Sequence, residues 1–359
     1  MHDRHRRAAL KRLARTGMAA GALVAGVACS RRDAPAAPPA ELPVRIISTE
    51  GTQVLTLQRL MGDKGYFRDF GVAPSLVTVA SGTTLIGSLL NGESDVCMFA
   101  GFSALLTAIA RGSGLRILGA ASVGGQYALL AKDPGLRRVQ HLEGRTIGVG
   151  QLGAQLHHAT VALLLAKGVA VDRVRFVNVG TSAAVFRAVA AGVVDAGPGQ
   201  ADVLGVLDRY DVHVLEDGDF GVELPEYTWQ ASCASMQAIR EKREVLVRTL
   251  AAYCRAFRHV QRDADSQQDF VQAQLQVAGG RDRDQLITGA RSQWQYLQHR
   301  RPYAEDLALS PARLAYMQAL NQRIAGQRQL FTYEQLIDDS LAREAVMRVQ
   351  KSLTGEPTR

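Results

Sequence analysis

The chain has 359 residues, of which 47% are hydrophobic and 21% charged, with 34 glycines and 11 prolines. This composition is that of a folded protein with one large domain or two medium ones, and it excludes a disordered chain, a collagen-like chain and a small disulfide-stapled scaffold. The formal net charge of +8 would suit a nucleic-acid partner. Six basic residues and one acid precede residue 16, however, and the rest of the chain carries 36 basic against 33 acidic residues, a net charge of +3. The excess charge therefore belongs to the N-terminal end, and no nucleic-acid partner is expected.

Residues 1–28 have the layout of a signal peptide: a basic start, then an uncharged apolar stretch at 18–28 that is too short to span a membrane. Residues 6–11 (RRAALK) resemble the twin-arginine export motif, and residues 26–29 (GVAC) resemble a lipobox. We expect export to the periplasm and membrane anchoring through a lipid on Cys29. A plain signal peptide followed by a chance cysteine is the alternative, and the choice between the twin-arginine and general secretory routes stays open.

Residues 29–43 are rich in alanine and proline, which predicts an extended tether. The remaining cysteines, Cys97, Cys233 and Cys254, form no CxxC motif and have no histidine at ligand spacing, so neither a metal site nor a thioredoxin-like site is indicated. Buried free thiols are expected, with a Cys233–Cys254 bridge as the lesser alternative.

From residue 44 onward, short strand-like runs alternate with helical periodicity. Strands are predicted at 44–48, 75–79, 95–99 and 115–121, and helices at 53–62, 83–91 and 102–111. Strands separated by helices pair in parallel through right-handed crossovers. Residues 44–131 are therefore predicted to form the first part of an α/β lobe.

The same order recurs about a hundred residues later, which predicts a second α/β lobe over 132–228. Strands are expected at 146–149, 174–179, 195–197 and 212–215, and helices at 153–167, 182–191 and 200–209. The clearest repeat pairs residues 82–95 with 182–195. Gly92 and Gly192 follow helices where a positive φ is needed, and Asp95 and Asp195 open the next strands. Chance likeness between generic β/α units is the alternative to a duplication.

The remainder, 229–359, changes character. Residues 240–350 are mostly helical in pattern, which predicts that the chain returns to the first lobe and ends in C-terminal helices. Segments 127–132 and 227–234 are then the two strands that cross between the lobes. Two crossings make a hinge about which the lobes could close on a ligand.

Five short segments in this order resemble the nitrate/sulfonate/taurine-type substrate-binding proteins of ABC importers, a family that also includes thiamine-pyrimidine precursor binders. They are residues 63–71 (DKGYFRDFG), 89–96 (LLNGESDV), 108–112 (AIARG), 141–149 (HLEGRTIGV) and 189–196 (VAAGVVDA). The resemblance implies a type II periplasmic-binding-protein fold with two doubly wound lobes. It also implies a small-molecule ligand held between the lobes and delivery to an ABC permease in the cytoplasmic membrane.

In parallel α/β lobes, ligands bind beyond the carboxyl ends of the strands, where helix N-termini favour anions. In the first lobe this rule selects Glu50, Gly51, Thr52, Gln53, Ser81, Gly82, Thr83, Phe102 and Ser103. In the second lobe it selects Gln151, Gly153, Gln155, Thr181, Ser182, Gln200 and Asp202. Serine, threonine and aspartate at such places are also ordinary helix N-caps, so a purely structural role is the alternative.

No arginine or lysine lies in these loops, so recognition through backbone N–H groups and hydroxyls is expected. Glu50 and Asp202 would instead favour a ligand with a donor or positive group. Phe102, Tyr127 and Trp229 could stack on a planar ligand, although aromatic residues more often pack in cores. The expected solute is small and anionic, and its identity stays open among sulfonates, nitrate, taurine, aromatic acids and pyrimidines.

An enzyme is not expected, because the chain has no nucleophile elbow, Walker-type phosphate loop or HExxH motif. The pair His157-His158 is interpreted as solvated. No cofactor and no metal are expected, and the protein is expected to be a monomer. Two alternatives remain: a lipid-anchored binding partner of a sensor, and an enzyme resembling a pyrimidine-precursor synthase.

Overall fold

The computed structural model describes residues 40–79, 81–279 and 282–354. The predicted signal peptide, Cys29 and most of the tether lie outside these residues. Within the described ranges, no helix combines the length and the apolar character needed to cross a membrane.

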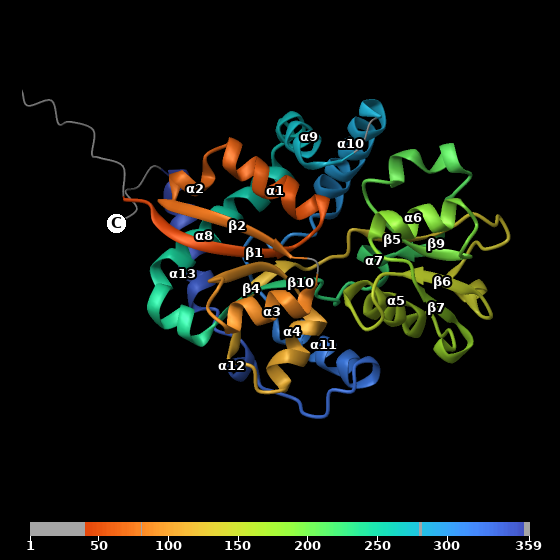
Figure 1. The fold of residues 1–359 in the computed structure, drawn as a ribbon, viewed down its shortest axis with the longest axis horizontal. Helices are drawn as coiled ribbons and strands as arrows, with labels where there is room; N and C mark the ends of the chain where they lie inside the picture. Colours follow the sequence, from red (N-terminus) through yellow and green to blue (C-terminus); the bar gives the residue numbers. More distant parts are fainter. Residues whose placement is uncertain (1–39, 80, 280–281, 355–359) are drawn as a thin grey trace, which may run out of the picture. The chain divides into compact units, whose positions relative to one another are not determined.

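The first lobe, called lobe 1, is built on a five-stranded sheet in the order β2-β1-β3-β10-β4 (Figure 1). β1 pairs in parallel with β2 and β3, whereas β10 is antiparallel to β3 and β4. The strands are β1 Leu42–Thr49, β2 Val72–Val79, β3 Val96–Gly101, β4 Leu115–Ser122 and β10 Gln230–Ser235. The first helices are α1 Thr52–Asp63, α2 Tyr66–Asp69, α3 Gly82–Leu90 and α4 Phe102–Ala110.

The second lobe, called lobe 2, repeats this plan with the sheet order β7-β6-β8-β5-β9, in which β5 is antiparallel to β8 and β9. Its strands are β5 Tyr127–Ala131, β6 Thr146–Val149, β7 Arg175–Asn178, β8 Ala196–Gln200 and β9 His213–Asp219. Its α-helices are α5 Gln155–Ala166, α6 Ser182–Ala190 and α7 Phe220–Glu223. Three 3₁₀ turns complete it: η1 Val139–Leu142, η2 Val171–Arg173 and η3 Leu204–Tyr210.

The prediction of two α/β lobes is confirmed, with local corrections. Residues 200–209 do not form an α-helix: Gln200 ends β8, the N–H of Ala201 donates to the carbonyl of Gln126, and only the 3₁₀ turn η3 follows. Of the two predicted crossing strands, the first begins at Tyr127 as predicted, and the second begins at Gln230 instead of residue 227. The chain passes between the two sheets at residues 123–126 and 224–229, and β5 and β10 are the strands that these segments enter.

The C-terminal region is helical as predicted. It comprises α8 Met236–Arg262, α9 Ser266–Val277, α10 Arg283–Arg300, α11 Pro311–Ile324, α12 Tyr333–Leu336 and α13 Ser340–Thr354. Helices α8, α9 and α13 pack with α1 and α2 on one face of the lobe 1 sheet, opposite α3 and α4 (Figure 1). Neighbouring β1 residues serve the two faces, because side chains alternate along a strand: Ile46 packs toward α8, and Ile47 toward α3 and α4.

Helix α10 differs from its neighbours because it also contacts lobe 2. The hydroxyl of Ser292 donates to the carbonyl of Ala201 at 2.8 Å, and the hydroxyl of Tyr296 donates to the carbonyl of Gly125 at 2.7 Å. Arg300 forms an ion pair with Asp219 at the end of β9, 3.1 Å away. The C-terminal region therefore connects to lobe 2 in addition to the two crossing segments.

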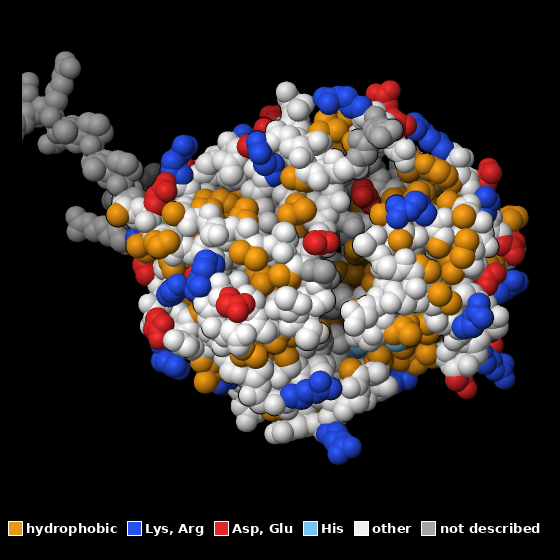
Figure 2. Space-filling view, in the orientation of Figure 1, with side chains coloured by type: hydrophobic (Ala, Val, Ile, Leu, Met, Phe, Trp, Pro, Cys, Tyr) orange, Lys and Arg blue, Asp and Glu red, His pale blue; other side chains and the backbone are white. Residues whose placement is uncertain are grey.

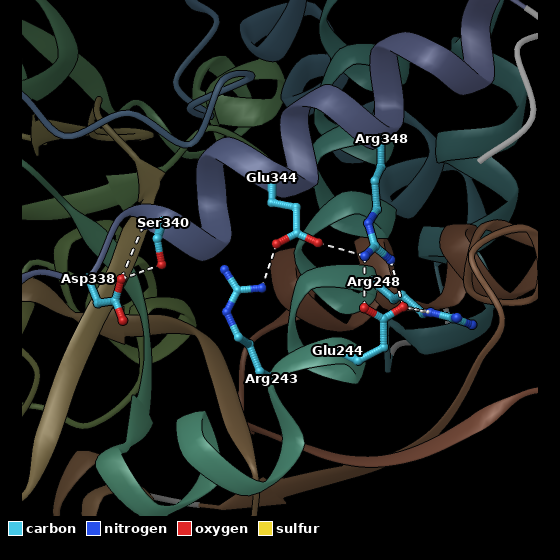
Figure 3. A network of polar contacts seen from close by, with 7 residues as sticks. All are labelled: Arg243, Glu244, Arg248, Asp338, Ser340, Glu344 and Arg348. Atoms are coloured by element: carbon cyan, nitrogen blue, oxygen red, sulfur yellow. Dashed lines mark hydrogen bonds and ion pairs between the residues drawn. The ribbon is translucent and has the colours of Figure 1, made fainter. Parts of the chain in front are cut away.

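An ion-pair network fastens α13 to α8 (Figure 3). The guanidinium of Arg348 donates two 2.8 Å hydrogen bonds to the carboxylate of Glu244 and one of 2.6 Å to Glu344. Arg248 also pairs with Glu244, 2.6 Å away. The hydrogen bonds from Arg348 lower the pKa of Glu244 to about 2, so this carboxylate stays charged over the whole neutral and mildly acidic range.

Candidate functional site

Polar side chains from both lobes meet where the parallel strands end. The amide of Gln53, at the start of α1, donates to the hydroxyl of Tyr303 at 2.9 Å. The amide of Gln200, at the end of β8, donates to Gln53 Oε1 at 3.4 Å. The Tyr127 hydroxyl lies 3.3 Å from Gln200 Oε1 and 3.2 Å from Ser182 Oγ. These five residues, called the central polar cluster, join lobe 1, lobe 2 and the C-terminal region.

An aromatic wall adjoins this cluster. Trp229 stacks on Tyr127 with a centroid separation of 5.2 Å and an interplanar angle of 20°, and Phe220 packs edge-on against Trp229 at 5.9 Å. A Cβ added to Gly125 would lie within 3.1 Å of both Phe220 and Trp229, so only glycine fits at this point of the first crossing. The neighbouring Gln126 is 2% exposed, and neither its Nε2 nor its Oε1 has a hydrogen-bond partner among the described residues.

A cavity of about 680 Å³ lies between the lobes. Lobe 1 supplies residues of α3 and α4, and lobe 2 supplies the loop that precedes α5. Figure 2 shows that the surface is hollowed between the two lobes, with hydrophobic side chains visible inside. Five residues predicted from the sequence line the cavity: Gly82, Thr83, Ser103, Gln151 and Gly153.

Several other predicted residues have defined positions. Ser81 and Thr181 are the N-caps of α3 and α6, their hydroxyls accepting hydrogen bonds from Thr84 N at 3.2 Å and Ala184 N at 3.3 Å. Gln155 donates to the hydroxyl of Tyr227 at 3.2 Å, and its Oε1 faces Gly101 of lobe 1. The remaining three, on the loop before α1 or at its start, are exposed or half-buried: Glu50, Gly51 and Thr52.

Two of the predicted site residues, Phe102 and Ser103, are buried. Phe102 has no exposed surface and belongs to the hydrophobic core, so its interpretation as a stacking platform is wrong for this structure. Ser103 is 3% exposed, and its hydroxyl donates to Asn321 Oδ1 at 2.7 Å. Both lie at the start of α4, directly after β3, and Ser103 also lines the 680 Å³ cavity.

Asp202 follows β8 and lies beside α10, in a smaller cavity of about 280 Å³. Burial raises the pKa of its carboxyl to about 6. Burial also raises the pKa of Tyr127, and the charge of Asp202 contributes to that shift. Asp202 is therefore the carboxyl group near the central polar cluster whose protonation changes close to neutral pH.

The histidine pair is not solvated as predicted. His158 is 1% exposed, and its Nδ1 lies 2.9 Å from the hydroxyl of Tyr227. Burial lowers the pKa of His158 to about 4, so the ring is neutral at pH 7. His157 is half-buried, and its Nδ1 accepts a hydrogen bond from Gly153 N at 3.1 Å. Over the described ranges no group of three histidine, cysteine or acidic side chains could hold a metal ion.

Sequence reasoning missed three residues of this region. Arg111 lines the 680 Å³ cavity but follows the C-terminal end of α4, away from the carboxyl ends of the strands, although it lies in one of the family-like segments. Gln126 belongs to a crossing segment without a recognisable pattern. Tyr303 comes from the C-terminal region, and only the tertiary fold brings it to Gln53.

Comparisons with known proteins agree with this architecture. Residues 61–265 match the model of the family described as NMT1/THI5 like. No curated protein matches the chain. Among solved structures, the periplasmic aliphatic sulphonate binding protein SsuA of Escherichia coli has a TM-score of 0.65 at 18% identity, covering 82% of this chain and 92% of that one.

Two further structures are similar. The alkanesulfonate-binding protein SsuA of Xanthomonas axonopodis pv. citri, bound to MOPS, has a TM-score of 0.60 at 22% identity, covering 86% of this chain and 99% of that one. A DszB mutant in complex with biphenyl-2-sulfinic acid has a TM-score of 0.57 at 19% identity, covering 85% and 99%.

The fold is thus that of the type II periplasmic binding proteins: two doubly wound lobes joined by two crossing segments, with a C-terminal helical region. The chain belongs to the NMT1/THI5-like family. The resemblance inferred from the five short segments is confirmed.

Proposed function

We propose that this chain is the extracytoplasmic solute-binding component of an ABC importer, acting as a monomer that presents its solute to a membrane permease. The observation that carries the proposal is the cavity between the lobes, whose walls come from both of them. A solute in such a cavity gains its full set of contacts only when the two lobes approach each other, so binding would favour a closed state. No catalytic role is proposed.

The solute is proposed to be small and anionic, and sulfonates are the favoured class. The N-termini of α3 and of α5 lie at the cavity, where helix dipoles and free N–H groups favour negative charge. Arg111 adds a guanidinium to the lining and makes no ion pair within the described ranges. The SsuA proteins that share the fold are named for sulfonates, which supports the same class here.

The proposed contacts fall into two groups. Gly82, Thr83, Arg111, Gln151 and Gly153 would surround the solute in the cavity. Gln53, Ser182 and Gln200 would hold the lobes together in the closed state through the central polar cluster. The remaining loop residues proposed as contacts are Glu50, Gly51, Thr52, Ser81, Ser103, Gln155, Thr181 and Asp202.

A thermal-shift screen would test the proposal. Taurine, alkanesulfonates, nitrate, aromatic carboxylates and pyrimidines would be added at millimolar concentration, because a ligand stabilises the folded state by RT ln(1 + [L]/Kd). Gln151→Ala should weaken the binding of a hit about tenfold, by removal of one hydrogen bond to a charged group. Gln322→Ala, an exposed change on α11, is the matched control.

Small-angle scattering with and without the hit would then measure closure. Unchanged dimensions at saturation would contradict the closing of the lobes. Turnover of a hit by the purified protein would contradict the binding role and favour an enzyme.

Periplasmic location and a lipid anchor at Cys29 are part of the same proposal. The periplasmic proteins that share the fold support the location, and the lipobox-like residues 26–29 support the anchor. Cys29→Ala should move the protein from the membrane fraction to the soluble periplasmic fraction. Unchanged membrane retention would exclude the lipid anchor.

A further inference from the structure

Four arginines line a second cavity, distinct from the one between the lobes. This arginine pocket has a volume of about 380 Å³ and shares no lining residue with the 680 Å³ cavity. Arg258 and Arg262 come from α8, Arg301 follows α10, and Arg313 lies in α11. The other lining residues are Val123, Tyr303, Ala304, Glu305, Asp306, Ala308 and Ser310.

Positive charge exceeds negative charge in this pocket, with four guanidinium groups against the carboxylates of Glu305 and Asp306. Glu305 is already engaged, because it pairs with Arg262 and accepts a 3.0 Å hydrogen bond from Gln261. Asp306 accepts a hydrogen bond from the N–H of Ala308 at 3.0 Å. The pocket therefore keeps a positive charge that its own acids do not neutralise.

Three of the arginines have no carboxylate partner among the described residues. Arg258 donates from Nε to the carbonyl of Glu305 at 3.1 Å, and Arg313 donates from Nη1 to the carbonyl of Val123 at 2.9 Å. Both side chains are half-buried, whereas Arg301 is exposed and its guanidinium has no hydrogen-bond partner in the part of the chain that the structure describes. Each guanidinium has five N–H donors, so most donors of all three groups are left for a ligand.

The pocket adjoins the first crossing between the lobes. Val123 begins that segment, and its N–H donates to the carbonyl of Pro302 at 2.7 Å while its carbonyl accepts from Arg313. Tyr303 forms an isolated antiparallel bridge with Ser122 at the end of β4. A ligand held by Arg301 and Arg313 would therefore also lie against the first segment that crosses between the lobes.

We infer that the arginine pocket binds a phosphate-like oxyanion. Arginine is suited to this ligand because its planar fork donates two parallel hydrogen bonds to a pair of anion oxygens. Half-buried guanidinium groups without a counter-ion gain most from such a partner, since they are already partly removed from water. The inference does not rest on the proposed solute-binding role, because the two cavities share no lining residue.

Isothermal titration of the full chain with inorganic phosphate, at ionic strength held constant with sodium chloride, tests the inference. Arg301→Gln is the main variant, because this exposed side chain makes no hydrogen bond or ion pair within the described residues, and it should weaken phosphate binding about tenfold. The double variant Arg258→Gln/Arg313→Gln should abolish it. Arg323→Gln, an exposed change on the same helix as Arg313, should leave it unchanged.

A second arm separates free phosphate from a lipid headgroup. Co-sedimentation with phosphatidic acid vesicles, against phosphatidylcholine vesicles, would be measured for the unmodified chain and for Arg301→Gln. A difference between the two proteins in either arm supports the pocket and identifies the source of the anion. Phosphate and vesicle binding that are both absent, or that are equal in the unmodified chain and in Arg301→Gln, would overturn the inference.

Discussion

The two lobes repeat one structural device and stabilise it differently. In lobe 1, Asp95 Oδ2 accepts the N–H of Arg45 at 2.8 Å, and Asp95 N donates to the carbonyl of Arg45 at 2.9 Å. In lobe 2, Asp195 makes the same two bonds with Thr146, at 2.7 and 3.0 Å. Each aspartate thus fastens the start of its strand to the neighbouring parallel strand, which supports a duplication over chance likeness.

The surroundings of the two aspartates differ. The Asp95 side chain is 3% exposed and pairs with both Arg45, at 2.6 Å, and Lys242, at 2.9 Å. Lys242 belongs to α8, which departs from helical geometry at that residue. The Asp195 side chain is 35% exposed, and its one ion-pair partner among the described residues is Arg145, 3.6 Å away. Through Lys242, the Asp95 carboxylate of lobe 1 is therefore also attached to α8 of the C-terminal region. Asp195 of lobe 2 has no such attachment within the described residues.

The largest effect is expected from the change Asp95→Asn. It leaves two cations beside a buried neutral amide, and we expect a loss of about 2 to 3 kcal/mol in the free energy of unfolding, below the range for fully buried pairs because both cations are partly exposed. Asp195→Asn should cost no more than about 1 kcal/mol, since the amide oxygen can still accept from Thr146. Urea denaturation of both variants measures the difference. Equal losses would show that Lys242 and α8 add nothing to lobe 1.

The same aspartate predicts a dependence on pH. Burial alone would raise the pKa of Asp95, but hydrogen bonds from Arg45 and Lys242 lower it below the ordinary value. The unfolded chain therefore binds this proton more tightly than the folded chain. The contribution of Asp95 is fully present above the ordinary carboxyl pKa, and it is lost as the pH falls through the lowered value of the folded state. Urea denaturation between pH 6 and pH 3 should show the Asp95→Asn variant losing less stability than the unmodified protein; parallel curves would contradict this assignment.

Features that depend on neighbouring residues could be predicted from the sequence, and features that depend on distant residues could not. Strands and helices of both lobes were predictable because alternation and helical periodicity are local, and the repeat placed Asp95 and Asp195 correctly. The end of β8 was not predicted correctly, because the N–H of Ala201 donates to the carbonyl of Gln126, which lies in a distant crossing segment. Five cavity residues were found from the rule on strand ends. Tyr303 and Arg111 were missed because one arrives with the C-terminal region and the other follows the far end of a helix.

Replacing the glycine that follows the matching helix of each lobe should lower the stability by the same amount in both lobes. Gly92 and Gly192 follow α3 and α6 with φ values of 70° and 69°, and an added Cβ would meet no atom within 4 Å at either place. Alanine at each position therefore costs only the left-handed backbone, about 1 kcal/mol. Thermal denaturation of the two single variants and of the double variant would measure it. Unequal single losses would mean that the turns are not equivalent and would weaken the case for the repeat.

The smallest effect concerns the network that fastens α13 to α8, for which lobe 2 has no counterpart within the described residues. Glu244→Gln removes the charge shared by Arg248 and Arg348, and it should cost about 0.5 kcal/mol, since the Glu244 side chain is 46% exposed and solvent screens the pair. Glu241→Gln on the same helix is the control, because within the described ranges the Glu241 carboxylate accepts a hydrogen bond from Gln237 and has no ion pair. The hydrogen bonds from Arg348 hold the pKa of Glu244 near 2 in the folded state, so its contribution to stability should persist above about pH 4.5 and decline as the pH falls toward 2.

Hydrogen exchange of the α13 amides, compared between Glu244→Gln and Glu241→Gln at pH 6, measures the loosening of α13 directly. Equal exchange in both variants would assign the attachment of α13 to its apolar face, where Leu341, Ala345 and Val349 are buried, instead of to the charges.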